Sequence, residues 1–289
     1  MSSLIWHQDP PPVLHRPIFL IALTGLFDIS GVATGALKWL GRSRAVTDLA
    51  SIDPDPFFDF TVQRPAVWLD EAGDRHITWP ENDIRSVRAD AAQHDLVVLS
   101  GIEPHMRWST FAGHLVEVAL ALGCETVVTV GAAAEAVPHT RTPSVVGSTT
   151  NLRLAARLGL SRPQYQGPTG LVGVLQTQLD EARIPAISLR VAVPHYLVNA
   201  QHPRSTAALL QHLEHVLGTP TGFRALDGEI DRWQEMHDAA VAGDPQATTF
   251  VRMLERDYDR RAEAAIPDAE DLGAAFEQFL REQRDDPES

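Results

Sequence analysis

The chain has 289 residues, of which 44% are hydrophobic and 21% are charged, as in an ordinary globular protein with one large domain or a domain and an appendage. Its formal net charge of -14 makes nucleic acid and anionic membrane surfaces poor partners, because an acidic chain gains nothing from counterion release. No apolar run approaches the ~20 residues that span a bilayer, and the N-terminus lacks the charged and apolar regions of a signal peptide. The single cysteine, Cys124, cannot form a disulfide within the chain. We therefore expect a soluble cytoplasmic protein.

The first part of the chain predicts the opening of an α/β fold. Residues 1–16 contain three consecutive prolines and read as an extended lead-in. The run "PIFLIALTG" (17–25) is apolar throughout, which is typical of a parallel strand that is buried on both faces. Residues 26–41 then show helical spacing, with Asp28 able to cap the start and Gly41 able to end the helix.

Residues 44–80 do not continue the alternation of strand and helix. Residues 44–50 predict a second strand, whereas 53–60 contain too many prolines for a regular element. In "AVWLDEAGDRHITWP" (66–80), two aromatic and β-branched runs flank a turn that contains glycine. This pattern predicts a β-hairpin that departs from the main sheet.

A β-α-β unit follows, with buried strands at 94–101 and 124–132 and a helix at 107–123. Strands and helices continue to alternate up to Gly218: strands are predicted at 144–149 and 185–194, and helices at 151–159, 169–183 and 203–218. This alternation predicts a three-layer α/β/α sandwich over residues 17–222.

Residues 223–284 carry no strand signal and predict a C-terminal helical appendage. Two helices are expected within 229–263, separated by a break at Gly243–Pro245, and a third is expected at 268–284. We expect the tail, 285–289, to be disordered. The helical appendage would pack on the main domain or between subunits.

Polar residues gather after the predicted strands. A Pro-His pair follows three of them and supplies His105, His139 and His195. Because ligands of open parallel sheets bind beyond the carboxyl ends of the strands, these turns could share one edge. Together with the glycine-rich turn of "YQGPTGLVGVL" (165–175), the candidate ligand or interaction residues are Gly25, Asp28, Glu103, His105, Arg107, Trp108, His139, Thr140, Arg141, Tyr165, Gly167, Gly170, His195 and Tyr196.

Two interpretations of these residues remain open. In one, imidazoles and Arg141 form an acid-base or anion-binding pocket in which Glu103 orients a neighbour. In the other, each proline ends a strand and each histidine bonds a nearby carbonyl at a rigid corner. No HExxH or CxxC spacing is present, so no metal site and no cofactor are predicted. The turn at 165–175 lacks the P-loop lysine, although its backbone could face an anion.

The motifs "GLFD", "SGIEPHMRW", "VPHTR", "YQGPTGLVGVL" and "VPHYL" occur in this order over about residues 16–218. In combination they resemble the proteasome assembly chaperone 2 family, in its actinobacterial form. The resemblance implies a fold like that of purine nucleoside phosphorylases and a homo-oligomer, for which a trimer is the expected form. It also implies a non-enzymatic chaperone-like role with protein partners such as proteasome subunits, and no catalytic residues. The alternative is an enzyme or small-molecule binder that uses Glu103, His139, Arg141 and His195 around a nucleoside- or phosphate-containing ligand.

Overall fold

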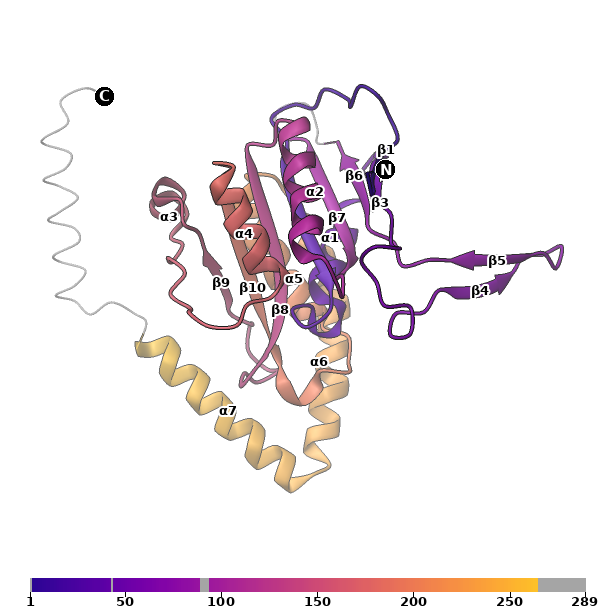
Figure 1. Cartoon of the computed structure of the whole chain (residues 1–289). Helices are drawn as coiled ribbons and strands as arrows, with labels where there is room; N and C mark the ends of the chain where they lie inside the picture. The colour runs from indigo at the N-terminus through magenta and orange to yellow at the C-terminus, as the bar shows by residue number, and fades with distance from the viewer. Residues whose placement is uncertain (1, 43, 89–93, 265–289) are drawn as a thin grey trace, which may run out of the picture.

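A computed structural model describes residues 2–42, 44–88 and 94–264 of the chain. The helix expected at 268–284 and the tail at 285–289 lie outside these residues. An eight-stranded sheet in the order β1-β3-β6-β7-β2-β8-β10-β9 forms the centre of the molecule, with helices on both of its faces (Figure 1). This arrangement confirms the mixed α/β class that the alternation of strands and helices predicts.

The middle of the sheet consists of four parallel strands. These are β7 (Leu96–Ile102), β2 (Ile18–Thr24), β8 (Thr126–Glu135) and β10 (Ala186–Pro194). Their continuous apolar runs predict all four from the sequence, because strands covered on both faces need no polar side. Their carboxyl ends lie at one edge, so the segments that follow them begin close together.

Antiparallel strands complete the sheet. On one side lies β9 (Val145–Ser148); on the other lie β6 (Asp83–Val87), β3 (Val46–Ile52) and β1 (Leu4–Trp6). The sequence analysis missed β6 and β1. The sequence of β6, DIRSV, is only five residues long and has two polar residues in succession, and β1 has three residues inside the expected lead-in.

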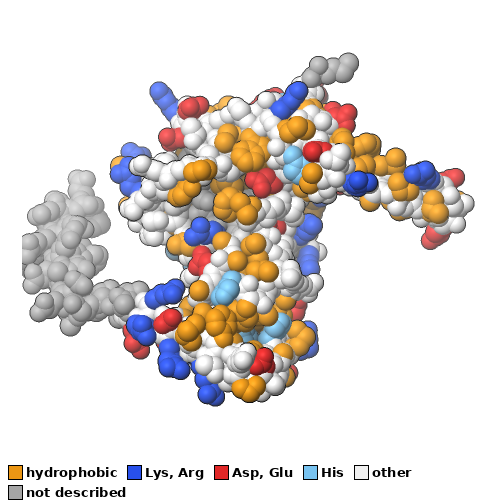
Figure 2. Space-filling model, turned by 60° about the horizontal axis from the view of Figure 1, so that its bottom comes forward, with side chains coloured by type: hydrophobic (Ala, Val, Ile, Leu, Met, Phe, Trp, Pro, Cys, Tyr) orange, Lys and Arg blue, Asp and Glu red, His pale blue; other side chains and the backbone are white. Residues whose placement is uncertain are grey.

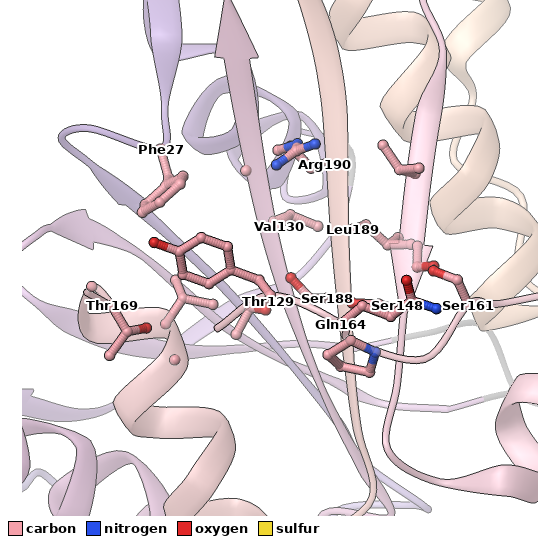
Figure 3. A pocket seen from close by; sticks show the side chains of 18 of the residues that line it. Phe27, Thr129, Val130, Ser148, Ser161, Gln164, Thr169, Ser188, Leu189 and Arg190 are labelled. Carbon is pink, nitrogen blue, oxygen red and sulfur yellow. The ribbon is translucent and has the colours of Figure 1, made fainter. Parts of the chain in front are cut away.

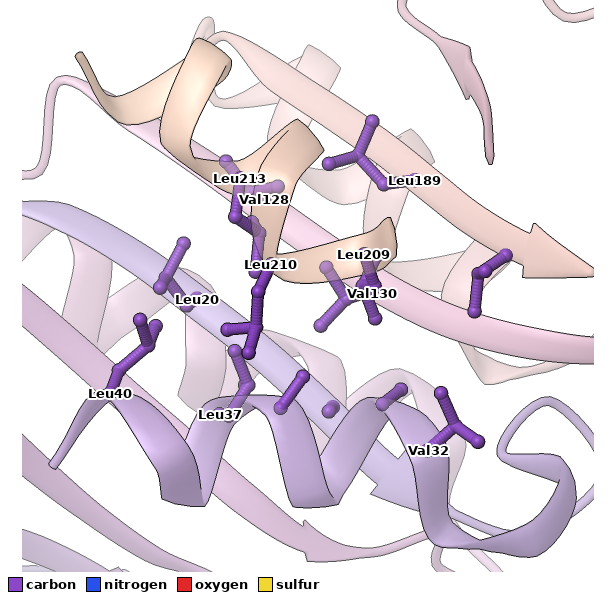
Figure 4. Packing of buried hydrophobic residues seen from close by; sticks show 14 of the residues in the cluster. Leu20, Val32, Leu37, Leu40, Val128, Val130, Leu189, Leu209, Leu210 and Leu213 are labelled. Carbon is purple, nitrogen blue, oxygen red and sulfur yellow. The ribbon is translucent and has the colours of Figure 1, made fainter. Parts of the chain in front are cut away.

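Four helices make the outer layers. Helices α1 (Val32–Leu40) and α5 (Pro203–Leu217) cover one face, where their leucines pack on Leu20, Val128 and Leu189 (Figure 4). Helices α2 (Trp108–Ala121) and α4 (Leu171–Glu181) cover the other face. Burial of these aliphatic side chains provides the main stabilising free energy of the three layers.

The C-terminal part contains α6 (Asp227–Ala242) and α7 (Pro245–Ala264), and the break between them confirms the expectation at Gly243–Pro245. Helix α6 packs on α5, and α7 extends back past the carboxyl edge of the sheet (Figure 1). A short helix, α3 (Leu152–Leu158), follows β9. None of the helices within the described ranges is both long and apolar enough to cross a membrane.

The predicted hairpin is present and forms a separate two-stranded sheet of β4 (Ala66–Leu69) and β5 (Arg75–Thr78). It projects from the end of the molecule that contains β3 and β6 (Figure 1). We call residues 66–79 the arm. Every residue of both arm strands is exposed, so the arm contributes nothing to either hydrophobic core.

Candidate functional site

The three Pro-His segments all follow parallel strands, but they do not surround one cavity. His139 and His195 meet through Tyr196, whose ring lies 5.9 Å from the first and 5.6 Å from the second between centroids. His105 lies apart, against Phe58 of the segment that follows β3. The strand β2, between β7 and β8, separates the two groups.

His139 is the most constrained member of the group, with only 1% of its surface exposed. Its backbone N–H donates to Tyr196 Oη (2.8 Å), which leaves the tyrosine hydroxyl free to donate to His139 Nδ1 (2.7 Å). In that tautomer, Nε2–H donates to Asp238 Oδ1 of α6 (3.1 Å). Burial lowers the pKa of His139 against the opposing effect of Asp238, and burial raises the pKa of Tyr196 to about 12.

Thr140 and Arg141 contact α7. The guanidinium of Arg141 bonds Asp259, and the Thr140 hydroxyl donates to Glu255 Oε1 at 2.6 Å. Tyr258 adds a hydrogen bond from its hydroxyl to the carbonyl of Thr142 (2.6 Å). Carboxylates of the chain itself therefore occupy the position at which the sequence analysis places an anionic ligand.

His195 begins a short 3-10 turn (His195–Leu197), and its Nδ1 bonds the carbonyl oxygen of Glu135 (3.1 Å). The ring of Phe250 from α7 packs edge-on against both His195 and Tyr196. The C-terminal helices thus cover this group of residues. The geometry does not support a pocket shared by Glu103, His139, Arg141 and His195.

Glu103 belongs to a second group, at the start of α4. A Cβ placed on Gly25 would lie 2.6 Å from Glu103 Oε2, and one placed on Gly170 would lie 3.2 Å from the ring of Phe27. The absence of a side chain at Gly25 thus leaves room for the Glu103 carboxylate, and Gly170 allows the close approach of Phe27. Asp28 is buried here and holds the start of α1, where its carboxylate accepts from Ala33 N (2.7 Å) and from the Thr34 hydroxyl (2.6 Å).

The third group has the geometry of a rigid corner. His105 Nδ1 accepts the backbone N–H of Asp59 (3.0 Å), and Trp108 Nε1 donates to the carbonyl of Pro104 (2.7 Å). Arg107 has a φ of 55° immediately before α2. These contacts connect the carboxyl end of β7 to α2 and to the irregular segment at 53–60.

A cavity of about 620 Å³ lies elsewhere, over β8, β10 and β9 and beside the start of α4. Of the candidate residues from the sequence, only Tyr165 and Gly170 line it. Gly167 lies next to Tyr165, and a Cβ placed on Gly167 would lie 2.7 Å from the Tyr165 hydroxyl oxygen. Figure 3 shows Thr129 and Ser188 side by side at its centre, between Thr169 on one side and Ser148 and Ser161 on the other.

Two hydroxyl side chains lie on the floor of this cavity, Thr129 of β8 and Ser188 of β10. On the face of β8 and β10 toward α1 and α5, the side chains are Val128, Val130 and Leu189, all within the core. The opposite face of the same strands carries Thr129 and Ser188. Hydroxyls in a central parallel strand are unusual, since both faces normally carry aliphatic residues. In "VVTVG" and "ISLRV", a hydroxyl residue stands between two aliphatic residues, and this pattern indicates that one face of each strand is polar. The sequence analysis missed this signal for the cavity.

The cavity is also cationic. Arg162 and Arg190 line it, and no aspartate or glutamate is among the described residues that form its lining. Arg190 has one distant ion pair, with Glu135 at 3.6 Å, and 48% of its side chain is exposed. The whole chain has a net charge of -14, whereas the charged side chains that line this cavity are positive. The cavity therefore favours the binding of an acidic group.

The arm presents apolar side chains on both faces. Val67, Leu69 and Ile77 share one face by strand register, and between 50% and 66% of each is exposed. On the other face, Trp68 stacks on His76 with ring centroids 4.6 Å apart, and it remains 50% exposed. Figure 2 shows hydrophobic side chains along the arm, with charged side chains toward its end.

These features define a mixed-sheet α/β protein with a projecting apolar arm, a cationic cavity and C-terminal helices over its strand ends. Within the part of the chain that the structure describes, no three His, Cys, Asp or Glu side chains are grouped so that they could hold a metal ion. The model of the PAC2 family matches residues 22–241, and the chain belongs to this family.

Comparison with solved structures supports the same family assignment. A PAC2 family protein from Streptomyces avermitilis is 38% identical, with a TM-score of 0.76 over 81% of this chain and 99% of that one. A proteasome-assembly chaperone homologue from Mycobacterium tuberculosis is 32% identical, with a TM-score of 0.74 over the same shares. An archaeal proteasome activator from Pyrococcus furiosus has a TM-score of 0.64 over 83% of this chain and 99% of that one; at 17% identity, this likeness shows the fold alone. No curated protein matches the chain.

Proposed function

We propose that the protein is a non-enzymatic, homo-oligomeric, chaperone-like assembly factor that binds other proteins through its arm. The observation that carries this proposal is the exposure of apolar residues on both faces of the arm. A two-stranded ribbon is marginally stable by itself in water, and exposed apolar patches of this kind mark protein interfaces. A protein surface that covered Val67, Leu69 and Ile77 would remove this apolar area from water.

The names of the relatives suggest the class of partner. The Mycobacterium tuberculosis relative is described as a proteasome-assembly chaperone homologue, and the Pyrococcus furiosus structure as that of a proteasome activator. Proteasome α-subunits are therefore the first partner to test. We do not favour the alternative of an enzyme for nucleoside or phosphate ligands, because Arg141 and His139 already contact carboxylates of α6 and α7.

The test is sedimentation velocity of the full chain, alone and mixed with purified proteasome α-subunits. We expect the mixture to contain a faster species that holds both proteins. Leu69→Ser with Ile77→Ser should abolish this species, because it removes two of the three aliphatic side chains on one face of the arm. Leu120→Ser with Leu152→Ser is the matched control, since these leucines are equally exposed but lie on α2 and α3.

Two results would contradict the proposal. The role as an assembly factor fails if no complex with α-subunits forms at micromolar concentrations, or if the arm variant binds as well as the control does. The homo-oligomeric part fails separately, if the chain alone sediments as a 31.7 kDa monomer at every concentration.

A further inference from the structure

We propose that the cavity over β8, β10 and β9 binds a small ligand in which one acidic group is carried by a single sugar or a polyol of the same length. This inference goes beyond the proposed function, because none of the residues that line the cavity belongs to the arm. Three observations carry it: a row of hydroxyl side chains, the position of Arg190 relative to this row, and the size of the cavity.

The hydroxyl side chains on the floor of the cavity lie in one row across neighbouring strands. Ser188 of β10 is paired with Thr129 of β8 on one side and with Ser148 of β9 on the other, and Ser148 forms a bridge with Ser161. Because neighbouring strands are about 4.8 Å apart, successive hydroxyls are separated by about this distance. A ligand with several hydroxyl groups can therefore bond more than one member of the row when it lies across the strands.

The central hydroxyls of the row have hydrogen-bonding capacity to spare. Thr129 is only 2% exposed, and its hydroxyl makes one long hydrogen bond, of 3.4 Å, to the carbonyl oxygen of Ile187. Among the residues that the structure describes, none forms a hydrogen bond with the hydroxyl of Ser188 or of Ser148. Polar groups that are removed from water need partners, so an apolar ligand over this floor would lose free energy. The row therefore favours a ligand that both donates and accepts hydrogen bonds.

Arg190 provides the positive charge for an acidic group. It follows Ser188 by two residues on β10, so its side chain leaves the same face of the strand about 6.6 Å from the row. Figure 3 shows Arg190 beyond the row, on the side where Phe27 lies. Its ion pair with Glu135 is long, at 3.6 Å, and Arg162 forms no ion pair with any residue in the described ranges. A guanidinium group binds phosphate and carboxylate groups through two parallel hydrogen bonds.

The dimensions of the cavity fit one monosaccharide with its acidic group. The volume of about 620 Å³ lies within the range of small-molecule sites, which is about 300–1,000 Å³. A single sugar can place its acidic group at Arg190 and its hydroxyls on the row, because the two lie only about 6.6 Å apart along the strand. Phe27 and Tyr165 form an aromatic wall on which the C–H groups of a sugar can pack.

Calorimetric titration of the full chain tests the inference, with ribose 5-phosphate and glucose 6-phosphate as probes. We expect at least one of them to bind, and to raise the melting temperature by about 2–4 °C at about five times its Kd. Arg190→Gln should weaken the affinity at least about tenfold, since it removes charged hydrogen bonds, and Ser188→Ala should weaken it by about two- to tenfold. The matched controls are Arg252→Gln, on the exposed side of α7, and Ser51→Ala, which is half-buried on β3 as Ser188 is on β10. Circular dichroism should show that every variant keeps the native fold.

Three further probes separate the parts of the ligand. Gluconate carries a carboxylate in place of the phosphate, so tighter binding of gluconate than of both sugar phosphates would identify the ligand as a sugar acid. Ribose and inorganic phosphate each lack one of the two parts, and we expect both to bind at least about tenfold more weakly than the best acidic sugar. The inference is overturned if no acidic sugar binds, if inorganic phosphate binds as tightly as the sugar phosphates do, or if Arg190→Gln or Ser188→Ala binds as tightly as its control. None of these results would affect the proposed role of the arm.

Discussion

The guanidinium of Arg141 and the carboxylate of Asp259 form a bidentate pair, with Nε 2.8 Å from Oδ1 and Nη2 2.9 Å from Oδ2. This pair joins the segment after β8 to α7, 118 residues further along the chain. Bidentate geometry restricts both side chains and holds the helix at one orientation. This pair acts together with the buried Val251 and Leu254 to hold α7 over the strand ends.

Loss of this pair should loosen α7 without unfolding the core. Asp259→Asn keeps the side-chain volume but removes the charge that pairs with Arg141. We expect faster amide hydrogen exchange across 245–264, by a few-fold, and unchanged exchange in β2 and β8. Asp257→Asn is the matched control, because Asp257 pairs with Arg260 on the same helix. Equal exchange rates in the two variants would show that the pair does not hold α7.

Burial of His139 should make stability depend on pH. Its folded-state pKa lies below the ordinary value of 6.5, so the unfolded chain binds the proton more readily. The neutral, buried imidazole of His139 makes its full contribution to the free energy of unfolding above pH 6.5. This contribution is lost as the pH falls through the folded-state pKa. We expect His139→Gln to flatten the fall in melting temperature between pH 7.5 and 5.5, whereas His215→Gln, at an exposed position on α5, should not. Parallel curves for wild type and His139→Gln would contradict this.

Substitution by alanine should destabilise the protein at Gly101 and stabilise it at Gly35. A methyl group on Gly101 would overlap the amide of Asn82, which is buried and bonds both the N–H (2.9 Å) and the C=O (3.1 Å) of Ile102. We expect Gly101→Ala to lower the free energy of unfolding by about 1–3 kcal/mol. Gly35 lies within α1 with no atom near the added carbon, so Gly35→Ala should raise it by about 0.5–1 kcal/mol. Urea titration measures both, and a stable Gly101→Ala variant would show that Asn82 can move.

Cys124 should be unreactive in the folded protein. It is buried, and burial raises the pKa of its thiol to about 12. The thiolate is the nucleophile, so at pH 8 its fraction is roughly a thousandth of that of an ordinary thiol. We expect no labelling by iodoacetamide under native conditions and one label per chain in guanidinium chloride. Rapid native labelling would show that the β8 end of the molecule opens often.

The sequence was sufficient to predict the elements that depend on local pattern. The parallel strands have continuous apolar runs, the arm has a glycine turn between two β-rich runs, and the break between α6 and α7 contains Gly243 and Pro245. Strand β6 was missed because its five residues, DIRSV, are too few and too irregular to show a strand period. Strand β1 was missed because three residues carry no periodicity.

The candidate residues could be placed at the strand ends, but their partners could not be predicted. The contact of Arg141 with Asp259 depends on how α7 folds back, and no spacing rule relates residues 118 positions apart. The cavity was missed for a different reason. We treated Thr129 and Ser188 as members of apolar strands, although their positions in the alternation place them on one face and the valines on the other.

The arm is joined to the body of the molecule by the segments at its two ends. A protease that cuts within this exposed ribbon would leave the central sheet intact, because no residue of β4 or β5 belongs to a hydrophobic core. The two products of limited digestion should therefore stay associated and separate in denaturant.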